Sequence, residues 1–131
     1  MLYVFNTWVV ANLLHPILIY LVWGGMDGEF LHDEIVRAYF LILPFSFVFS
    51  LPALIIAWFI FYMIKRIDIT VISKFITWTL IVTVLPLIVW FCSFGDWDLQ
   101  KEDLELIMPS SIAAIASIFI RIKQFFKLFN Y

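Results

Sequence analysis

The chain has 131 residues, of which 65% are hydrophobic and 14% are charged, and its formal net charge is -2. Soluble domains average about 45–50% apolar and about 25% charged residues, and a chain this short could not bury such an excess of apolar side chains. The composition therefore excludes an ordinary soluble domain and indicates a protein whose apolar side chains face lipid.

Four apolar stretches follow one another along the chain, each close to the ~20 residues that cross a bilayer core of ~30 Å. They cover residues 2–23, 38–64, 75–94 and 104–120. We expect the first to be retained, because no basic segment precedes it and no cleavage site follows it. The second exceeds the core thickness, so tilt, a kink or an extension beyond the lipid is expected. The sequence predicts an all-α polytopic membrane protein, a single domain in which four transmembrane helices form a bundle.

The charges in the connecting segments predict the orientation of this bundle. Residues 24–37 and 95–103 form two loops on one side and hold two of the eight Lys and Arg residues. The loop 65–74 and the basic tail 121–131 hold the other six. Because cytoplasmic loops are enriched in Lys and Arg, we expect both termini to lie in the cytoplasm.

The carboxylates follow the opposite pattern, since only Asp68 of the ten lies on the inner side. We call the main outer set the acidic rim; it consists of Asp27, Glu29, Asp33, Glu34, Asp96, Asp98, Glu102 and Asp103. The rim lacks the Asp/Asn spacing and central glycine of an EF-hand, which favours a solvated acidic surface over a calcium site. Such a surface would steer a basic partner that arrives from outside.

All five prolines lie in or at the start of a predicted span: Pro16, Pro44, Pro52, Pro86 and Pro109. Proline removes a helix hydrogen bond and can kink the helix axis, which membrane helices tolerate where neighbours satisfy the freed carbonyl. We expect kinks near Pro16, Pro52 and Pro86 and therefore a curved bundle. A weak repeat at an offset of 70 residues pairs Pro16 with Pro86. Duplication and chance both explain it.

The first span carries His15, the only ionisable side chain deep in the predicted membrane, one helical turn after Asn12. The two side chains share a helix face with Trp8. Polar groups in hydrocarbon are costly and usually face the bundle interior or a watery cavity. Two interpretations stay open: His15 is a proton or ligand site, or Asn12 and His15 are interhelical hydrogen-bond partners. Ser46 and Ser50 form a comparable polar patch on the second span.

Small residues on the last span predict a tight contact between helices. Ser110, Ala113, Ala114 and Ser117 recur at three- and four-residue spacing along one face. Such residues let helix backbones approach closely, so we expect a helix–helix seam here. Whether the seam is internal or faces a partner stays open.

The second span is unusually rich in phenylalanine around its circumference. A protein-docking surface on this span is therefore a hypothesis. The residues are Phe40, Phe45, Phe47, Phe49, Phe59 and Phe61.

The sequence offers little for catalysis. It contains no G-x-S-x-G, no H-E-x-x-H and no glycine-rich phosphate loop. The single cysteine, Cys92, excludes an internal disulfide and a cysteine-based metal cluster. We therefore expect no enzyme activity, no cofactor and no metal. The soluble parts are too short for a nucleic-acid-binding domain, so membrane lipids and a protein in the membrane are the expected partners.

The whole chain resembles the immunity proteins of pore-forming colicins in size, in its four spans, in its cytoplasmic ends and in its Phe/Ile-rich, Lys-poor composition. It looks most like the four-span group that serves colicins A, B and N, and its length is similar to that of the colicin N member. The resemblance is one of architecture, without a diagnostic motif, so it assigns no functional residue.

The resemblance implies a multi-pass protein of the bacterial inner membrane that protects the toxin-producing cell. It would bind the toxin's pore-forming domain within the membrane and block channel opening. The alternative is a small subunit of a channel, a transporter or a larger membrane complex, which the polar pair Asn12 and His15 also fits. A lipid-modifying enzyme would need a cluster of acids, histidines or nucleophiles near an interface.

Overall fold

The described part of the chain consists of six α-helices and contains no β-strand. The computed structural model describes residues 2–27, 32–94 and 101–129. The predicted all-α class is thus confirmed. The helices are α1 (Leu2–Asp27), α2 (His32–Phe49), α3 (Leu51–Arg66), α4 (Val71–Phe94), α5 (Lys101–Ile120) and α6 (Ile122–Phe129).

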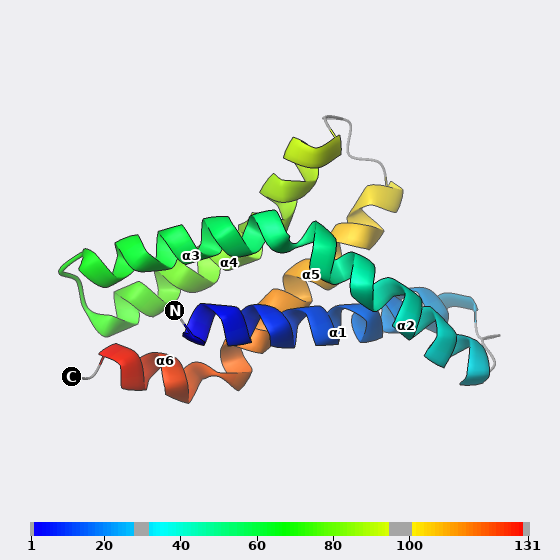
Figure 1. The fold of residues 1–131 in the computed structure, drawn as a ribbon, viewed down its shortest axis with the longest axis horizontal. Coiled ribbons are helices and arrows are strands. Elements are labelled where there is room, and N and C mark those ends of the chain that lie inside the picture. Colours follow the sequence, from blue (N-terminus) through cyan, green and yellow to red (C-terminus); the bar gives the residue numbers. More distant parts are fainter. Residues whose placement is uncertain (1, 28–31, 95–100, 130–131) are drawn as a thin grey trace.

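The helices alternate in direction along the long axis of the molecule (Figure 1). α1 leads away from the N-terminus, α2 and α3 return together, α4 leads out again, and α5 returns to α6. The N-terminus, the α3–α4 turn and α6 lie together at one end, which we call the α6 end. α5 makes its most extensive contact with α1 and its next with α4, so it packs against both of these helices.

Two helices are long and apolar enough to cross a membrane: α1 over Leu2–Leu21 and α4 over Val71–Cys92. A third span is present if the bent pair α2–α3 is counted as one. The apolar part of α5, Ile107–Ile120, is shorter. Many large apolar side chains point outward, and Phe40 is 66% exposed. So much exposed apolar surface is rare on soluble monomers and is favourable in lipid.

The predicted second span, residues 38–64, consists of two helices rather than one continuous helix. α2 ends at Phe49 and α3 begins at Leu51, with a bend of 49° between them. Pro52 lies in the first turn of α3, where its ring excludes the carbonyl four residues back and its nitrogen has no hydrogen to donate. The kink expected near Pro52 is therefore confirmed. The other four prolines lie inside uninterrupted helices.

The helices extend beyond the predicted spans. α2 begins at His32 rather than at residue 38, and most of the predicted tail 121–131 forms α6. The difference arises because hydropathy marks only the apolar part of a helix, whereas polar residues at its ends continue the same hydrogen-bonded turns. The non-helical part of the predicted inner loop 65–74 is correspondingly short, residues 67–70.

Aromatic rings form the core at the α6 end. The Phe61 ring lies 4.8 Å from the Trp78 ring in a T-shaped arrangement and 5.4 Å from the Tyr3 ring, which stacks on it. Phe125 of α6 contacts both Tyr3 and Phe61 and is completely buried. Such pairs contribute about 0.5–1.5 kcal/mol each beyond the area that they bury. This cluster holds α6 against α1, α3 and α4.

Candidate functional site

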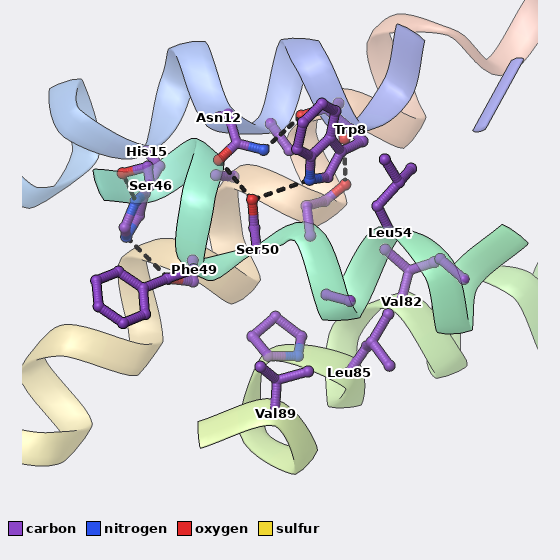
Figure 2. Close-up of a pocket in the computed structure, with 18 of the residues that line it drawn as sticks. Trp8, Asn12, His15, Ser46, Phe49, Ser50, Leu54, Val82, Leu85 and Val89 are labelled. Carbon is purple, nitrogen blue, oxygen red and sulfur yellow. Dashed lines mark hydrogen bonds between the residues drawn. The ribbon is translucent and has the colours of Figure 1, made fainter. Parts of the chain in front are cut away.

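A cleft of about 380 Å³ lies in the bundle and is lined by residues from all of α1 to α5. Figure 2 shows α2 and α3 on one side of it, with Phe49 and Leu54, and α4 on the other, with Val82, Leu85 and Val89. These walls are apolar. α2 and α4 diverge away from the α6 end (Figure 1).

Two phenylalanines of α2 form the exposed rim of the cleft. Phe45 and Phe49 both line it, yet Phe45 is 63% exposed and Phe49 is 58% exposed. Their rings stack at 6.4 Å, one helical turn apart. Of the six phenylalanines of the second span, Phe45 and Phe49 line the cleft and Phe61 belongs to the aromatic core, and a docking surface on this span stays a hypothesis.

His15 lies at the polar side of the cleft and joins three helices. Its Nδ1 lies 2.8 Å from the Ser46 hydroxyl on α2, and its Nε2 lies 2.8 Å from the Ser110 hydroxyl on α5. A neutral imidazole has one N–H donor and one acceptor, so one serine accepts a hydrogen bond and the other donates one. Of the two roles left open for His15, the structure shows the interhelical hydrogen bonds.

Asn12 belongs to a second group of hydrogen bonds, which lies one turn closer to the α6 end. The Trp8 indole N–H donates to the Ser50 hydroxyl, and that hydroxyl donates to the Asn12 side-chain oxygen, both at 2.9 Å. The Asn12 amide nitrogen donates back to the Trp8 carbonyl at 2.9 Å. The Ser50 side chain makes no capping hydrogen bond to α3. It instead ties the break between α2 and α3 to α1.

The small residues of α5 form an internal seam. Ala113, Ala114 and Ser117 are buried, and the contact between α5 and α1 is the most extensive in the bundle. Ser117 donates to the carbonyl of Ala114 at 2.7 Å, within its own helix. Ser110, the fourth predicted seam residue, is the one that reaches His15. All four residues also line the cleft, so the seam forms part of its wall.

All eight residues of the acidic rim lie outside the part of the chain whose side chains are described. Its role as a surface for a basic partner stays a prediction. Within the described residues, no group of three His, Cys, Asp or Glu side chains could hold a metal ion. Cys92 is exposed.

The pairing between the two polar patches was not predicted. Asn12 and His15 on α1 face Ser50, at the α2–α3 break, and Ser46 on α2. A three-residue spacing on α1 thus meets a four-residue spacing on the second span. Two polar patches of matching length on neighbouring spans are a signal that could have suggested this contact. No comparable signal pointed to the contact between His15 and Ser110, which lie 95 residues apart.

Comparisons with protein-family models, with curated proteins and with solved structures find no match. The function of the protein must therefore be inferred from the chemistry of this cleft. Its walls offer apolar contact. Six of its polar side chains bond to one another in two groups: His15 with Ser46 and Ser110, and Ser50 with Trp8 and Asn12. This arrangement favours recognition of an apolar surface by shape over recognition of a charged or polar ligand.

Proposed function

We propose that this protein is a bacterial inner-membrane immunity protein that binds the pore-forming domain of a colicin-type toxin within the membrane and blocks channel opening. The observation that carries the proposal is the apolar cleft between α2–α3 and α4, with Phe45 and Phe49 exposed at its rim. The partner proposed here, a pore-forming toxin domain, is inferred from the architectural resemblance to colicin immunity proteins. A protein with so little chain outside the bilayer must meet its partner largely through its intramembrane faces.

The proposal includes four spans, with both termini in the cytoplasm. The bent pair α2–α3 is one span, and α5 is the fourth. α5 connects the far end of α4 to the α6 end, and its Ser117 and Ile118 are completely buried among its neighbours. A helix surrounded by other helices needs less apolar surface of its own. The α6 end also carries six of the eight Lys and Arg residues, as expected of a cytoplasmic side.

The cleft suits an apolar helix that approaches from the lipid. It extends along α4 from Trp78 to Trp90, about 18 Å of helix at 1.5 Å per residue. A helix in a groove anchors itself through side chains at positions i, i+3, i+4 and i+7. In this mode a few apolar side chains of the toxin fill the cleft and its helix lies across Phe45 and Phe49. A toxin helix held there cannot join the rearrangement that opens the pore.

The direct test is survival of sensitive bacteria that express the chain. Cells challenged with a panel of pore-forming toxins should resist one toxin and stay sensitive to its relatives. A C-terminal fluorescent reporter that folds only in the cytoplasm reports the orientation in the same cells. Unchanged killing across the panel would reject the immunity function, and a dark reporter on a protein present in the membrane would reject the cytoplasmic C-terminus.

A matched pair of variants tests the cleft itself. Phe45→Ala and Phe40→Ala remove the same ring from similarly exposed positions of α2, but only Phe45 lines the cleft. Truncating an aromatic anchor in an interface typically costs 1 kcal/mol or more, so Phe45→Ala should lower the tolerated toxin concentration by about fivefold or more. Phe40→Ala should tolerate the same concentration as the unmodified chain. Equal protection by both variants at equal expression would place the toxin elsewhere.

A channel or transporter subunit is the second candidate, because Asn12 and His15 both line the cleft. Liposomes that contain the purified chain and leak one ion would favour this function. Loss of that leak in His15→Ala and Asn12→Ala would place the pathway along the polar side of the cleft. The immunity protein should instead give tight liposomes.

A further inference from the structure

Positive charge is concentrated at the α6 end. Six of the eight Lys and Arg residues of the chain lie there, whereas Asp68 is the only Asp or Glu among the described residues that does. Asp68 is itself exposed in the short turn between α3 and α4. The cations come from three separate segments, which the fold brings together: Lys65 and Arg66 end α3, Lys74 lies in the first turns of α4, and Arg121, Lys123 and Lys127 lie at and in α6.

α6 separates its apolar and cationic residues onto opposite faces. Phe125 and Phe129, four residues apart, point into the aromatic core. Lys123 and Lys127, also four residues apart, are exposed on the other face. The fully buried Phe125 ring fixes the rotation of α6 about its own axis. The two lysines are therefore held outward by the packing of the rest of the helix.

Aromatic rings hold three of the other cations in place. The Arg66 guanidinium lies 4.3 Å from the centre of the Tyr62 ring, and the Lys74 ammonium lies 5.0 Å from that of Phe129. The Arg121 guanidinium lies 5.6 Å from the Tyr3 ring. A ring face orients a cation but leaves its positive charge in place, whereas a carboxylate would neutralise that charge. The charge at this end thus remains available to an anion from outside the protein.

We infer that the α6 end is a binding surface for the phosphate headgroups of anionic lipids. The surface combines outward lysines with aromatic rings at the end of a membrane-spanning bundle, which is where lipid phosphates lie. Lys and Arg near an anionic bilayer surface each contribute about 1 kcal/mol of attraction, and the attraction falls off within a Debye length. The inference rests on the membrane location in the proposed function, but it requires no toxin.

The experiment uses the purified full chain in detergent, titrated with phosphatidylglycerol and phosphatidylcholine at equal concentrations and examined by native mass spectrometry. The unmodified chain should retain phosphatidylglycerol in preference to phosphatidylcholine. The double variant K123Q/K127Q should bind phosphatidylglycerol roughly 30-fold more weakly at low salt, since each lost cation accounts for about a fivefold change. Because both lysines are exposed, the variant keeps the aromatic core.

Two controls make the result specific to this end. R37Q/K101Q removes the same number of charges from the opposite end and should change the affinity by less than about threefold. K123R/K127R keeps the charges and should bind like the unmodified chain. Equal retention of the two lipids by the unmodified chain would overturn the inference, and so would an equal loss in R37Q/K101Q. Since no toxin is present, these outcomes are independent of the immunity test.

Discussion

The helices at the α6 end meet through aromatic rings, whereas around the cleft they meet through hydrogen bonds between polar side chains. At the α6 end Tyr3, Phe61 and Phe125 contact one another, and Phe125 is completely buried. At the cleft, His15 and the hydroxyl of Ser50 connect α1 to its neighbours. Both kinds of contact can hold helices together in lipid. Apolar contact alone does not favour a neighbouring helix over lipid, so close packing or hydrogen bonds must stabilise the association of helices.

These two kinds of contact divide the molecule into two regions. We call the aromatic α6 end the closed region and the surroundings of the cleft the open region. At the α6 end large rings pack against one another, and the cleft reaches this core at Val4, Ala57 and Trp78. Short serine side chains join helices at single points and leave the apolar walls between them free, as in the cleft. We therefore expect most of the stability of the fold to come from the α6 end, and binding to depend on the cleft.

Phe125→Ala tests the closed end and should have the largest effect. Removing a fully buried phenylalanine typically costs 3–5 kcal/mol, from lost contacts and from the cavity that remains. The matched control is Phe59→Ala on α3, where the ring is 64% exposed and should cost less than about 1 kcal/mol. Unfolding of the detergent-solubilised chain, followed by circular dichroism, measures both. Similar losses in the two variants would show that the aromatic cluster is not what closes this end.

His15→Ala tests the open region and should have a smaller effect on stability. The variant removes two interhelical hydrogen bonds and leaves Ser46 and Ser110 without that partner. Such bonds contribute about 0.6–1.7 kcal/mol each in membrane bundles, so a loss of about 1–3 kcal/mol is expected. Leu13→Ala on the exposed face of the same helix controls for shortening a side chain on α1. A loss no greater than that of Leu13→Ala would mean that His15 does not hold the three helices together.

The sequence predicted those features that depend on local chemistry. The helical class followed from composition and apolar length, and the kink near Pro52 followed from the geometry of proline itself. The polar side of α1 was also predictable, because Asn12 and His15 cannot face hydrocarbon without cost. Each of these conclusions requires only a residue and its immediate neighbours.

The sequence could not predict which helix faces meet. In a soluble helix the apolar stripe marks the side that packs, but a membrane helix is apolar all round, since lipid and protein interior are similar solvents for it. The rotations of α1 and α5 that bring His15 to Ser110 therefore cannot be predicted from apolar periodicity, whereas the contact with Ser46 had a signal only in the matching polar patches. α6 is the exception, because its Phe and Lys residues lie on opposite faces and so mark the side that packs. The prediction of a basic tail at 121–131 did not use that pattern.

The smallest expected effect concerns the junction between the closed and the open regions, where Ser50 ties the α2–α3 break to Asn12 and Trp8. A double-mutant cycle of Ser50→Ala and Asn12→Ala should give a coupling free energy of about 0.6 kcal/mol, typical of one hydrogen bond between membrane helices. The four proteins of the cycle are compared by the same unfolding measurement. A coupling near zero would mean that the two side chains act independently. The orientation of α2 over the cleft would then depend on Pro52 and on the bonds of His15, rather than on this serine.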